Sequence, residues 1–155
     1  MIKINVISKN NNWLHYIKKP NNYLDKKIKK LNSKVKEFKK NQIFFTLLLS
    51  ESKEIKYLNK KFRKKNKATD VLSFPFYTKK ELNRKLKTDK EIYIGDIIIN
   101  LNKIKNKRVL KNFKLEFDRL WIHGLIHLFG HDHKKEKEFY RMSQIEKKYL
   151  KFINA

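Results

Sequence analysis

The amino-acid sequence predicts an α+β fold in which a roughly four-stranded mixed sheet packs against about five helices in two layers. Short apolar or alternating segments of strand length are interspersed with longer segments whose apolar residues recur every three or four positions. Strands mixed with helices in this way favour a two-layer domain. The chain has 155 residues, with only three glycines and two prolines and no internal repeat. This length is typical of one domain, so we expect a single domain over residues 1–155.

Four strands are predicted, at residues 2–7, 43–49, 71–74 and 92–99. The first alternates apolar and polar residues, which is typical of a strand. The second is the apolar run IFFTLLL, which indicates a strand buried on both faces. The third ends at Pro75, because proline has no N–H to continue a ladder. The fourth, IYIGDIII, is expected to be interrupted at Gly95 and Asp96.

Apolar periodicity places four of the helices. Their apolar stripes are Leu24, Ile28, Leu31, Val35 and Phe38; Ile55, Leu58 and Phe62; Phe113, Phe117, Leu120, Trp121, Leu125 and Leu128; and Phe139, Met142, Ile145, Tyr149 and Ile153. The first helix is expected to begin just after Pro20, and Ser50 is positioned to cap the second. The third, over about 113–129, is apolar on nearly all sides in its last turns, which predicts a buried central helix. Residues 77–91 are polar and are expected to form an exposed loop.

The chain carries 40 Lys and Arg residues against 15 Asp and Glu, a formal net charge of +25. Such an excess favours a polyanionic partner, most simply nucleic acid. Only five of the 40 are Arg, however, and Lys, Asn and Ile are residues of A/T-rich codons. Genome composition alone would therefore enrich lysine on any solvated surface. The charge leaves both interpretations open, nucleic-acid binding and compositional drift.

Several classes of protein are excluded by what the sequence lacks. Cysteine is absent, which excludes disulfides, thiol catalysis and cysteine-based zinc or iron–sulfur sites. A metal site would therefore use His, Asp or Glu. No apolar run approaches the roughly 18–20 residues of a membrane-spanning helix. We expect a soluble, cytoplasmic protein with no membrane partner.

Four of the five histidines lie within eleven residues, in the segment HGLIHLFGHDH. His123 and His127 are four positions apart, so they share one face of the predicted helix and can bind one metal ion. Gly130 stands where the helix would end, because glycine accepts the left-handed backbone of a C-cap. The chain can then return and present His133 as a third ligand. Three protein nitrogens leave a fourth tetrahedral position for water, which is the layout of a catalytic zinc site.

The same spacing matches the long motif of the metzincin proteases, but one position differs. Gly124 follows the first histidine, where those proteases keep a glutamate as general base. This substitution argues against a protease. Asp132 lies between two candidate ligands and could orient one of them through a hydrogen bond. His131 is expected only to pack or to line the entrance of the site.

Three segments together resemble the YbeY endoribonucleases, a family of bacterial ribosomal-RNA maturation factors. The segment 123–133 (HGLIHLFGHDH) fits the three-histidine signature of the family, 68–76 (ATDVLSFPF) fits its TDVLSFP segment, and 95–100 (GDIIIN) fits its GDI strand. The order and separation of the segments agree, and the match spans essentially the whole chain. His131 stands where many members carry tyrosine.

This resemblance implies one Zn²⁺ per chain, held by His123, His127 and His133. It also aligns Arg63 with a family arginine tied to activity. The family acts on single-stranded RNA, matures ribosomal RNA ends, notably those of the small subunit, and surveys defective ribosomes. The expected partners are therefore ribosomal RNA and the ribosome or its small subunit.

The expected chemistry follows from these assignments. Zinc lowers the pKa of its water to about 7, which would provide a nucleophile for the phosphodiester or a base for the ribose 2′-OH. Arg63 would pair with the phosphate and offset the charge that builds in the transition state. Thr69, Asp70 and Ser73 could border the cleft, although polar capping of a short strand explains them equally well.

Two other classes of function remain open. The first is a non-catalytic ribosome or RNA-binding assembly factor with a structural zinc, in which no RNA cleavage exists. The second is another zinc hydrolase, such as a metalloprotease, which Gly124 argues against and a peptide-cleavage assay would detect.

Overall fold

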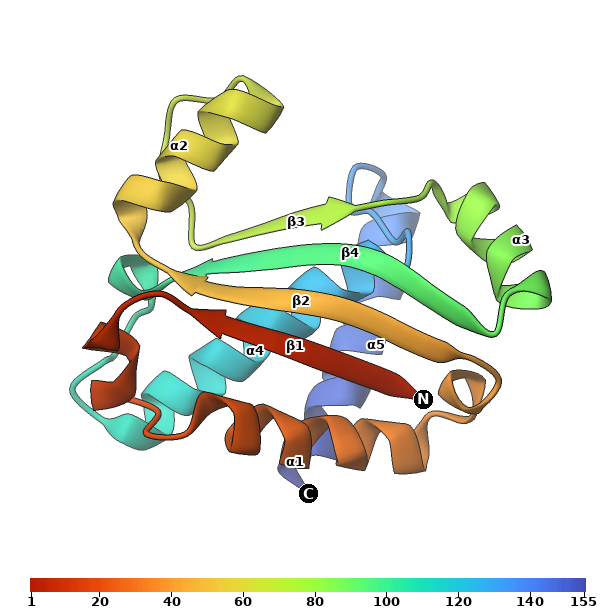
Figure 1. Cartoon of the computed structure of the whole chain (residues 1–155), viewed down its shortest axis with the longest axis horizontal. Helices are drawn as coiled ribbons and strands as arrows, with labels where there is room; N and C mark the ends of the chain where they lie inside the picture. The colour runs from red at the N-terminus through yellow and green to blue at the C-terminus, as the bar shows by residue number, and fades with distance from the viewer.

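The computed structural model describes residues 1–155 and contains one four-stranded mixed sheet of order β1-β2-β4-β3 (Figure 1). The strands are β1 (Ile2–Ser8), β2 (Gln42–Ser50), β3 (Val71–Pro75) and β4 (Glu91–Asn100). The first, second and fourth run parallel, and β3 pairs antiparallel with β4 at one edge of the sheet. The predicted α+β fold is therefore confirmed.

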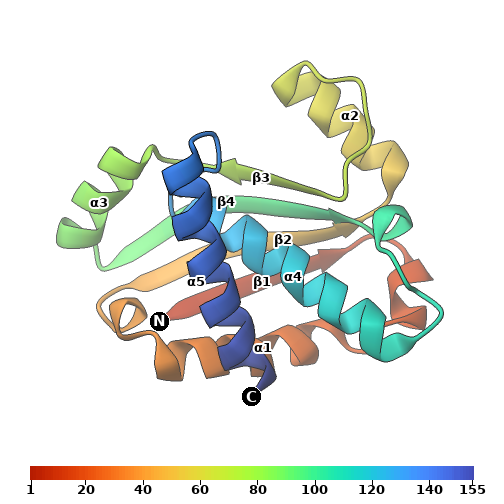
Figure 2. The ribbon, with the colours of Figure 1, turned by 180° about the vertical axis from the view of Figure 1, so that it is seen from behind.

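Five α-helices accompany the sheet: α1 (Pro20–Lys34), α2 (Ser52–Arg63), α3 (Lys79–Thr88), α4 (Leu110–Leu128) and α5 (Glu136–Asn154). The face of the sheet covered by α1, α4 and α5 is called the inner face (Figure 2). On the opposite, outer face only α2 packs, at one end (Figure 1). Ten residues of α4 are buried, which confirms a buried central helix. No helix combines the length and the apolarity that crossing a bilayer requires.

The strand β2 shows how the two faces differ. Its inner side chains are fully buried and its outer ones are partly exposed: Ile43, Phe45, Leu47 and Leu49 against Phe44, Thr46 and Leu48. This alternation is the period of two that a strand imposes. The expectation of burial on both faces is therefore wrong, because no layer of helices covers the outer face.

The strand β4 is continuous and carries a bulge where an interruption was predicted. The register between β2 and β4 shifts so that Ile94 has no partner of its own, and Gly95 has a φ of +142°, which favours glycine. A Cβ on Gly95 would overlap the backbone carbonyl of Phe74 on β3. The extra residue of the bulge allows Ile94 and Ile97 both to be buried in the main core.

Most of the segment 77–91 forms α3, so the prediction of an exposed loop is wrong. Thr78 caps this helix, since its Oγ1 accepts the backbone N–H of Glu81 at 3.2 Å. Leu82 is buried in the main core, and Leu86 packs against it. Two leucines one turn apart are too few to give a recognisable period in an otherwise polar segment, and this is why periodicity alone missed the helix.

Two helix boundaries also differ from the prediction. The helix α1 ends at Lys34, and Phe38 lies in a separate 3-10 turn, Lys36–Lys39, where it is still buried. Ser50 does not cap α2, because it ends β2 and its hydroxyl donates to the Glu54 carboxylate at 2.5 Å.

Candidate active site

A polar cleft of about 710 Å³ lies beside β3, one of the two edge strands of the sheet. Its walls come from the end of α2, from β3, from the C-terminal half of α4 and from the loop that follows α4. Nine candidate site or cleft residues of the sequence analysis line it: Arg63, Thr69, Asp70, Ser73, His123, His127, His131, Asp132 and His133. The structure thus brings together side chains from several separate segments of the chain.

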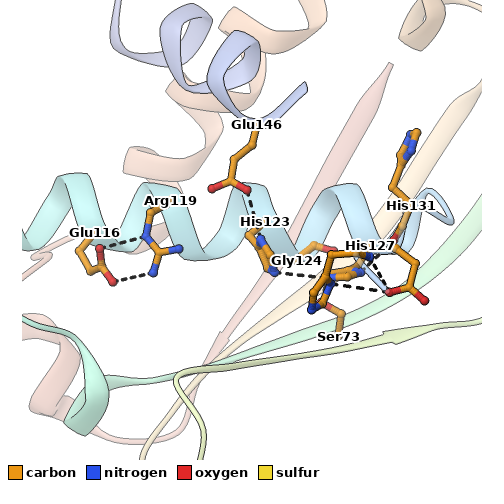
Figure 3. A network of polar contacts seen from close by, with 10 residues as sticks. Ser73, Glu116, Arg119, His123, Gly124, His127, His131 and Glu146 are labelled. Atoms are coloured by element: carbon orange, nitrogen blue, oxygen red, sulfur yellow. Dashed lines mark hydrogen bonds and ion pairs between the residues drawn. The ribbon is translucent and has the colours of Figure 1, made fainter. Parts of the chain in front are cut away.

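The helix α4 presents two histidines to this cleft (Figure 3). Most of its other side chains are buried and apolar, whereas a polar stripe of Glu116, Arg119, His123 and His127 is only partly buried. The rings of His123 and His127 have centroids 4.7 Å apart. One turn earlier Arg119 donates two hydrogen bonds, of 2.8 and 3.1 Å, to the Glu116 carboxylate.

The turn after α4 brings the third histidine to the other two. Gly130 has a φ of +88°, as a left-handed turn at the end of a helix requires. The ring centroid of His133 then lies 5.2 Å from that of His127 and 6.0 Å from that of His123. The backbone N–H of His133 donates to the Asp132 carboxylate at 2.7 Å, which fixes the local turn.

The outer ring nitrogens of two histidines have partners that determine their tautomers. Nδ1 of His127 lies 2.9 Å from the carbonyl oxygen of His131, and Nδ1 of His123 lies 3.2 Å from the carboxylate of Glu146 on α5 (Figure 3). Both acceptors favour a proton on Nδ1, so both Nε2 atoms offer lone pairs. These Nε2 atoms face each other at 3.2 Å.

This arrangement fits a bound cation. Two lone pairs that face each other repel, and a metal ion between them removes the repulsion. Two nitrogens on one tetrahedral zinc, at about 2.0–2.1 Å each, would lie about 3.3 Å apart, close to the 3.2 Å between His123 Nε2 and His127 Nε2. Ligand atoms of His127, Asp132 and His133 also lie within 4.8 Å of one another. Asp132 is therefore a candidate ligand as well as a candidate hydrogen-bond partner.

Burial keeps His127 ready to bind a metal. Desolvation, followed by the proximity of His123, lowers the pKa of His127 to about 4. Its imidazole is therefore neutral at pH 7, and neutral imidazole is the form that binds metals.

Glu146 was missed by the sequence analysis. It lies on α5, well after the histidine motif, and no spacing rule connects it to His123. Carboxylates that accept from a ligating imidazole orient the ring and raise its basicity. The contact between His123 and Glu146 therefore belongs to the site, although only the packing of α5 against α4 reveals it.

Replacing Glu146 tests this contact. We expect Glu146→Ala to weaken metal affinity by about 10–100-fold, and Glu146→Gln, which retains an acceptor, to weaken it less. Competition with a chromophoric chelator measures the affinity. Glu138→Gln, at an exposed position of the same helix, is the matched control. Unchanged affinity in Glu146→Ala would assign the contact to helix packing alone.

Arg63 is the last residue of α2 and lies on the wall of the cleft. One Nη atom donates to the carbonyl oxygen of Ser73, and the guanidinium carbon lies 5.3 Å from the centroid of the Phe74 ring. No other protein group accepts a hydrogen bond from Arg63. The guanidinium is thus held in place while its remaining N–H groups have no protein acceptor.

The three polar residues of the β3 region make local contacts in addition to lining the cleft. Thr69 donates to the carbonyl of Val71 at 3.2 Å, and the Asp70 carboxylate accepts the Val71 N–H at 2.8 Å. The Ser73 hydroxyl donates to the carbonyl of Gly124 at 3.3 Å. These contacts stabilise the edge strand and its packing against α4. They are the structural roles that the sequence analysis left open for these residues.

Gly124 allows α4 to approach the sheet closely. A Cβ at this position would lie 2.8 Å from Cγ2 of Ile97 and 3.1 Å from Oγ of Ser73. The glutamate that metzincins carry at the corresponding position would therefore clash with Ile97 and crowd Ser73 unless the helix moved away from the sheet. Both sequence and packing thus argue against a protease mechanism that uses this position.

We expect Gly124→Ala to destabilise the protein. Overpacking costs about 1–3 kcal/mol, which outweighs the gain in helix propensity of about 1 kcal/mol, because Ile97 is enclosed in the core. Urea denaturation measures the free energy of unfolding. Lys111→Ala, at an exposed position of the same helix, is the control, and equal stability of the two variants would contradict the close packing.

His131 is partly buried and has a different environment from the other three histidines. Its side chain points away from His123 and His127 (Figure 3). It lines both the polar cleft and a neighbouring apolar pocket that includes Phe38 and Phe129. Burial, then nearby Lys79 and Arg141, lowers the pKa of His131. Its backbone carbonyl is the part that contacts a candidate ligand.

Comparisons of sequence and structure find similarity to known proteins. Residues 8–154 match the sequence model of a family described as Endoribonuclease YbeY. Endoribonuclease YbeY of Pelagibacter ubique is 45% identical, with 100% of this chain and 98% of the relative covered. The protein of the same name from Ehrlichia canis is 34% identical, with 97% and 91% covered. A Thermotoga maritima protein solved in solution has a TM-score of 0.58 at 28% identity, with 99% of this chain and 89% of that protein covered.

The matched region contains the whole cleft, from Arg63 to Lys134. The similarity therefore extends over the residues that form the site as well as over the sheet and the helices that position them. By its sequence along nearly its full length, and in agreement with its fold, the chain belongs to the YbeY family of endoribonucleases, hydrolases that cleave RNA.

Proposed function

We propose that this protein is a zinc-dependent endoribonuclease that cleaves single-stranded RNA in the cytoplasm, matures ribosomal RNA ends, in particular those of the small subunit, and takes part in ribosome quality control. One observation carries the proposal: the rings of His123, His127 and His133 converge in a cleft that Arg63 also lines. Family membership supports RNA cleavage. The metal and the choice of substrate are inferred from the cleft.

The histidines would hold the metal through defined atoms. His123 and His127 would bind through Nε2, since their Nδ1 atoms contact Glu146 and the His131 carbonyl. His133 would be the third ligand. A bound zinc ion supplies a water with a pKa near 7, which provides a nucleophile or a base at neutral pH.

Arg63 would bind the phosphate that is cleaved. Its free N–H groups can form a bidentate pair with the non-bridging oxygens, and the positive charge would stabilise the additional negative charge of the transition state. Lys65 and Lys134 also line the cleft. They would contact neighbouring phosphates, which positions the strand without reading its sequence.

The volume of the cleft and the net charge of the protein support single-stranded ribosomal RNA as the substrate. The cleft volume of about 710 Å³ is in the range of pockets for small molecules. We infer that it admits part of an unpaired strand and excludes a double helix. The net charge of +25 favours a large polyanion such as the ribosome.

The proposal is tested by cleavage of a labelled single-stranded RNA beside a duplex of the same sequence, and of a precursor that carries unprocessed small-subunit ends. We expect cleavage of the single strand and of the precursor ends, loss of cleavage on chelation, and recovery with zinc. A protein that holds zinc and binds RNA but cleaves none would instead be an assembly factor with a structural metal. Cleavage of peptides without cleavage of RNA would indicate another zinc hydrolase.

A further inference from the structure

We propose that the outer face of the sheet binds the unpaired bases of the same RNA strand whose phosphate enters the cleft. This inference rests on the proposed function, because it requires RNA as the substrate. Five aromatic rings lie on this face and at its border, and we call them the aromatic platform: Phe44, Phe62, Phe74, Phe76 and Tyr93. No helix lies in front of the middle of this face (Figure 1).

The strand register aligns one part of the platform in a row across the sheet. Lys3 of β1 pairs with Phe44 of β2, which pairs with Tyr93 of β4. The ring of Phe76, just after β3, has its centroid 5.1 Å from that of Tyr93. The Lys3 ammonium lies 5.7 Å from the centroid of Phe44. A cation and three rings thus follow one another across the sheet, from β1 over β2 and β4 to the residue just after β3.

The second part of the platform connects this row to the cleft. Phe62 of α2 and Phe74 of β3 have ring centroids 5.8 Å apart. Arg63 lies over the Phe74 ring and also donates to the carbonyl of Ser73 on the wall of the cleft. Because one guanidinium contacts both surfaces, a strand whose phosphate binds Arg63 can continue over β3 onto the outer face.

The chemistry of the platform matches single-stranded nucleic acid. Phe62 and Phe76 are 61% and 54% exposed, and unpaired bases stack on such rings without regard to sequence. Cations lie among the rings, including Lys61 at 5.4 Å from the centroid of Phe62. Lysine is depleted in protein–protein interfaces, so this mixture favours RNA over a protein partner.

Two carboxylates share the face but do not alter this conclusion. Asp96 accepts the hydroxyl of Tyr93 at 2.5 Å, so it is engaged in holding the ring. Glu91 lies at the exposed beginning of β4. These two carboxylates are outnumbered by three cations at or beside the rings, Lys3, Lys61 and Arg63.

The test compares binding of a short single-stranded RNA with binding of an abasic strand that has the same number of phosphates. Stacking loses roughly 1–3 kcal/mol per base when the ring is removed. We therefore expect Phe76→Ala and Phe62→Ala each to weaken RNA binding by about fivefold or more, with little effect on the abasic strand. Phe76→Tyr should retain binding, and Phe76→Leu should not. Tyr140→Ala removes a ring that is 67% exposed on α5, a helix on the inner face of the sheet, and it should change neither affinity.

The possible outcomes separate this inference from the proposed function. Two results would contradict RNA binding by the platform while leaving the proposed activity unaffected. In the first, the wild-type protein cleaves RNA but binds it no more tightly than the abasic strand. In the second, both alanine variants bind RNA as tightly as the wild type does. In that case a protein partner becomes the better occupant of the face. If the variants lose affinity for RNA although the wild-type protein cleaves none, RNA binding by the platform is supported and the proposed activity is contradicted. Thermal melts confirm that each variant is folded, as expected for side chains more than half exposed.

Discussion

Replacing His133 with alanine is expected to remove stoichiometric metal binding and RNA cleavage together while the fold remains intact. The side chain is 53% exposed and does not belong to the main core, so its loss leaves the packing unchanged. Removing a hydrogen-bond partner of a metal ligand typically costs about 10–100-fold in affinity or activity, and removal of the ligand itself should exceed this. Mass spectrometry measures the metal content, a cleavage assay measures the rate, and a thermal melt shows whether the fold is intact.

Two other histidines provide matched controls. His15 is exposed and far from the motif in sequence, so His15→Ala should retain metal and activity. The His131 side chain points away from His123 and His127 (Figure 3), so His131→Ala should retain the metal. If the His133→Ala protein still holds one metal ion per chain, His133 is not the third ligand. Asp132 would then be the third ligand, since its carboxylate is close enough to bind the metal.

Replacing Arg63 with alanine is expected to reduce cleavage by about 10²–10³-fold, the usual effect of losing one group that stabilises transition-state charge. The metal content should not change, because Arg63 contacts β3 and none of the histidines. Arg63→Lys should recover only part of the rate, since an ammonium cannot form the bidentate pair.

The control for Arg63 is Lys60→Ala, which removes an exposed cation from the same helix and should have little effect on the rate. Single-turnover cleavage at saturating protein separates a loss of chemistry from a loss of binding. Equal single-turnover rates for wild type and Arg63→Ala would show that the arginine is one more solvated cation of a basic helix.

The local parts of this site could be predicted from the sequence because short-range geometry determines them. The four-residue spacing of His123 and His127 places both on one helix face, and Gly130 accounts for the return of the chain. Both features follow from the backbone alone. The strands were also placed correctly, because apolar runs of strand length leave few alternatives once helices of longer period are assigned.

The remaining parts depend on packing between distant segments, which one sequence does not reveal. Glu146 comes to His123 only because α5 lies against α4. Leu82 becomes a core residue only because α3 closes the end of the inner layer. The uncovered outer face was missed for the same reason, since the apolar run of β2 does not indicate that its two sides have different neighbours.

The position of the candidate ligands has a consequence for how the protein responds to metal supply. All three histidines lie within residues 123–133, so the site closes only short loops and little chain entropy is lost when a metal joins its ligands. Two of them are partly buried and His133 is exposed, and 29 buried apolar residues form the main core without them. The chain is therefore expected to fold without the metal ion, unlike zinc fingers, which are unfolded without it. Under the zinc-dependent activity proposed above, depletion of zinc in the cell should accordingly leave folded, inactive protein that regains activity when the metal returns, without new synthesis.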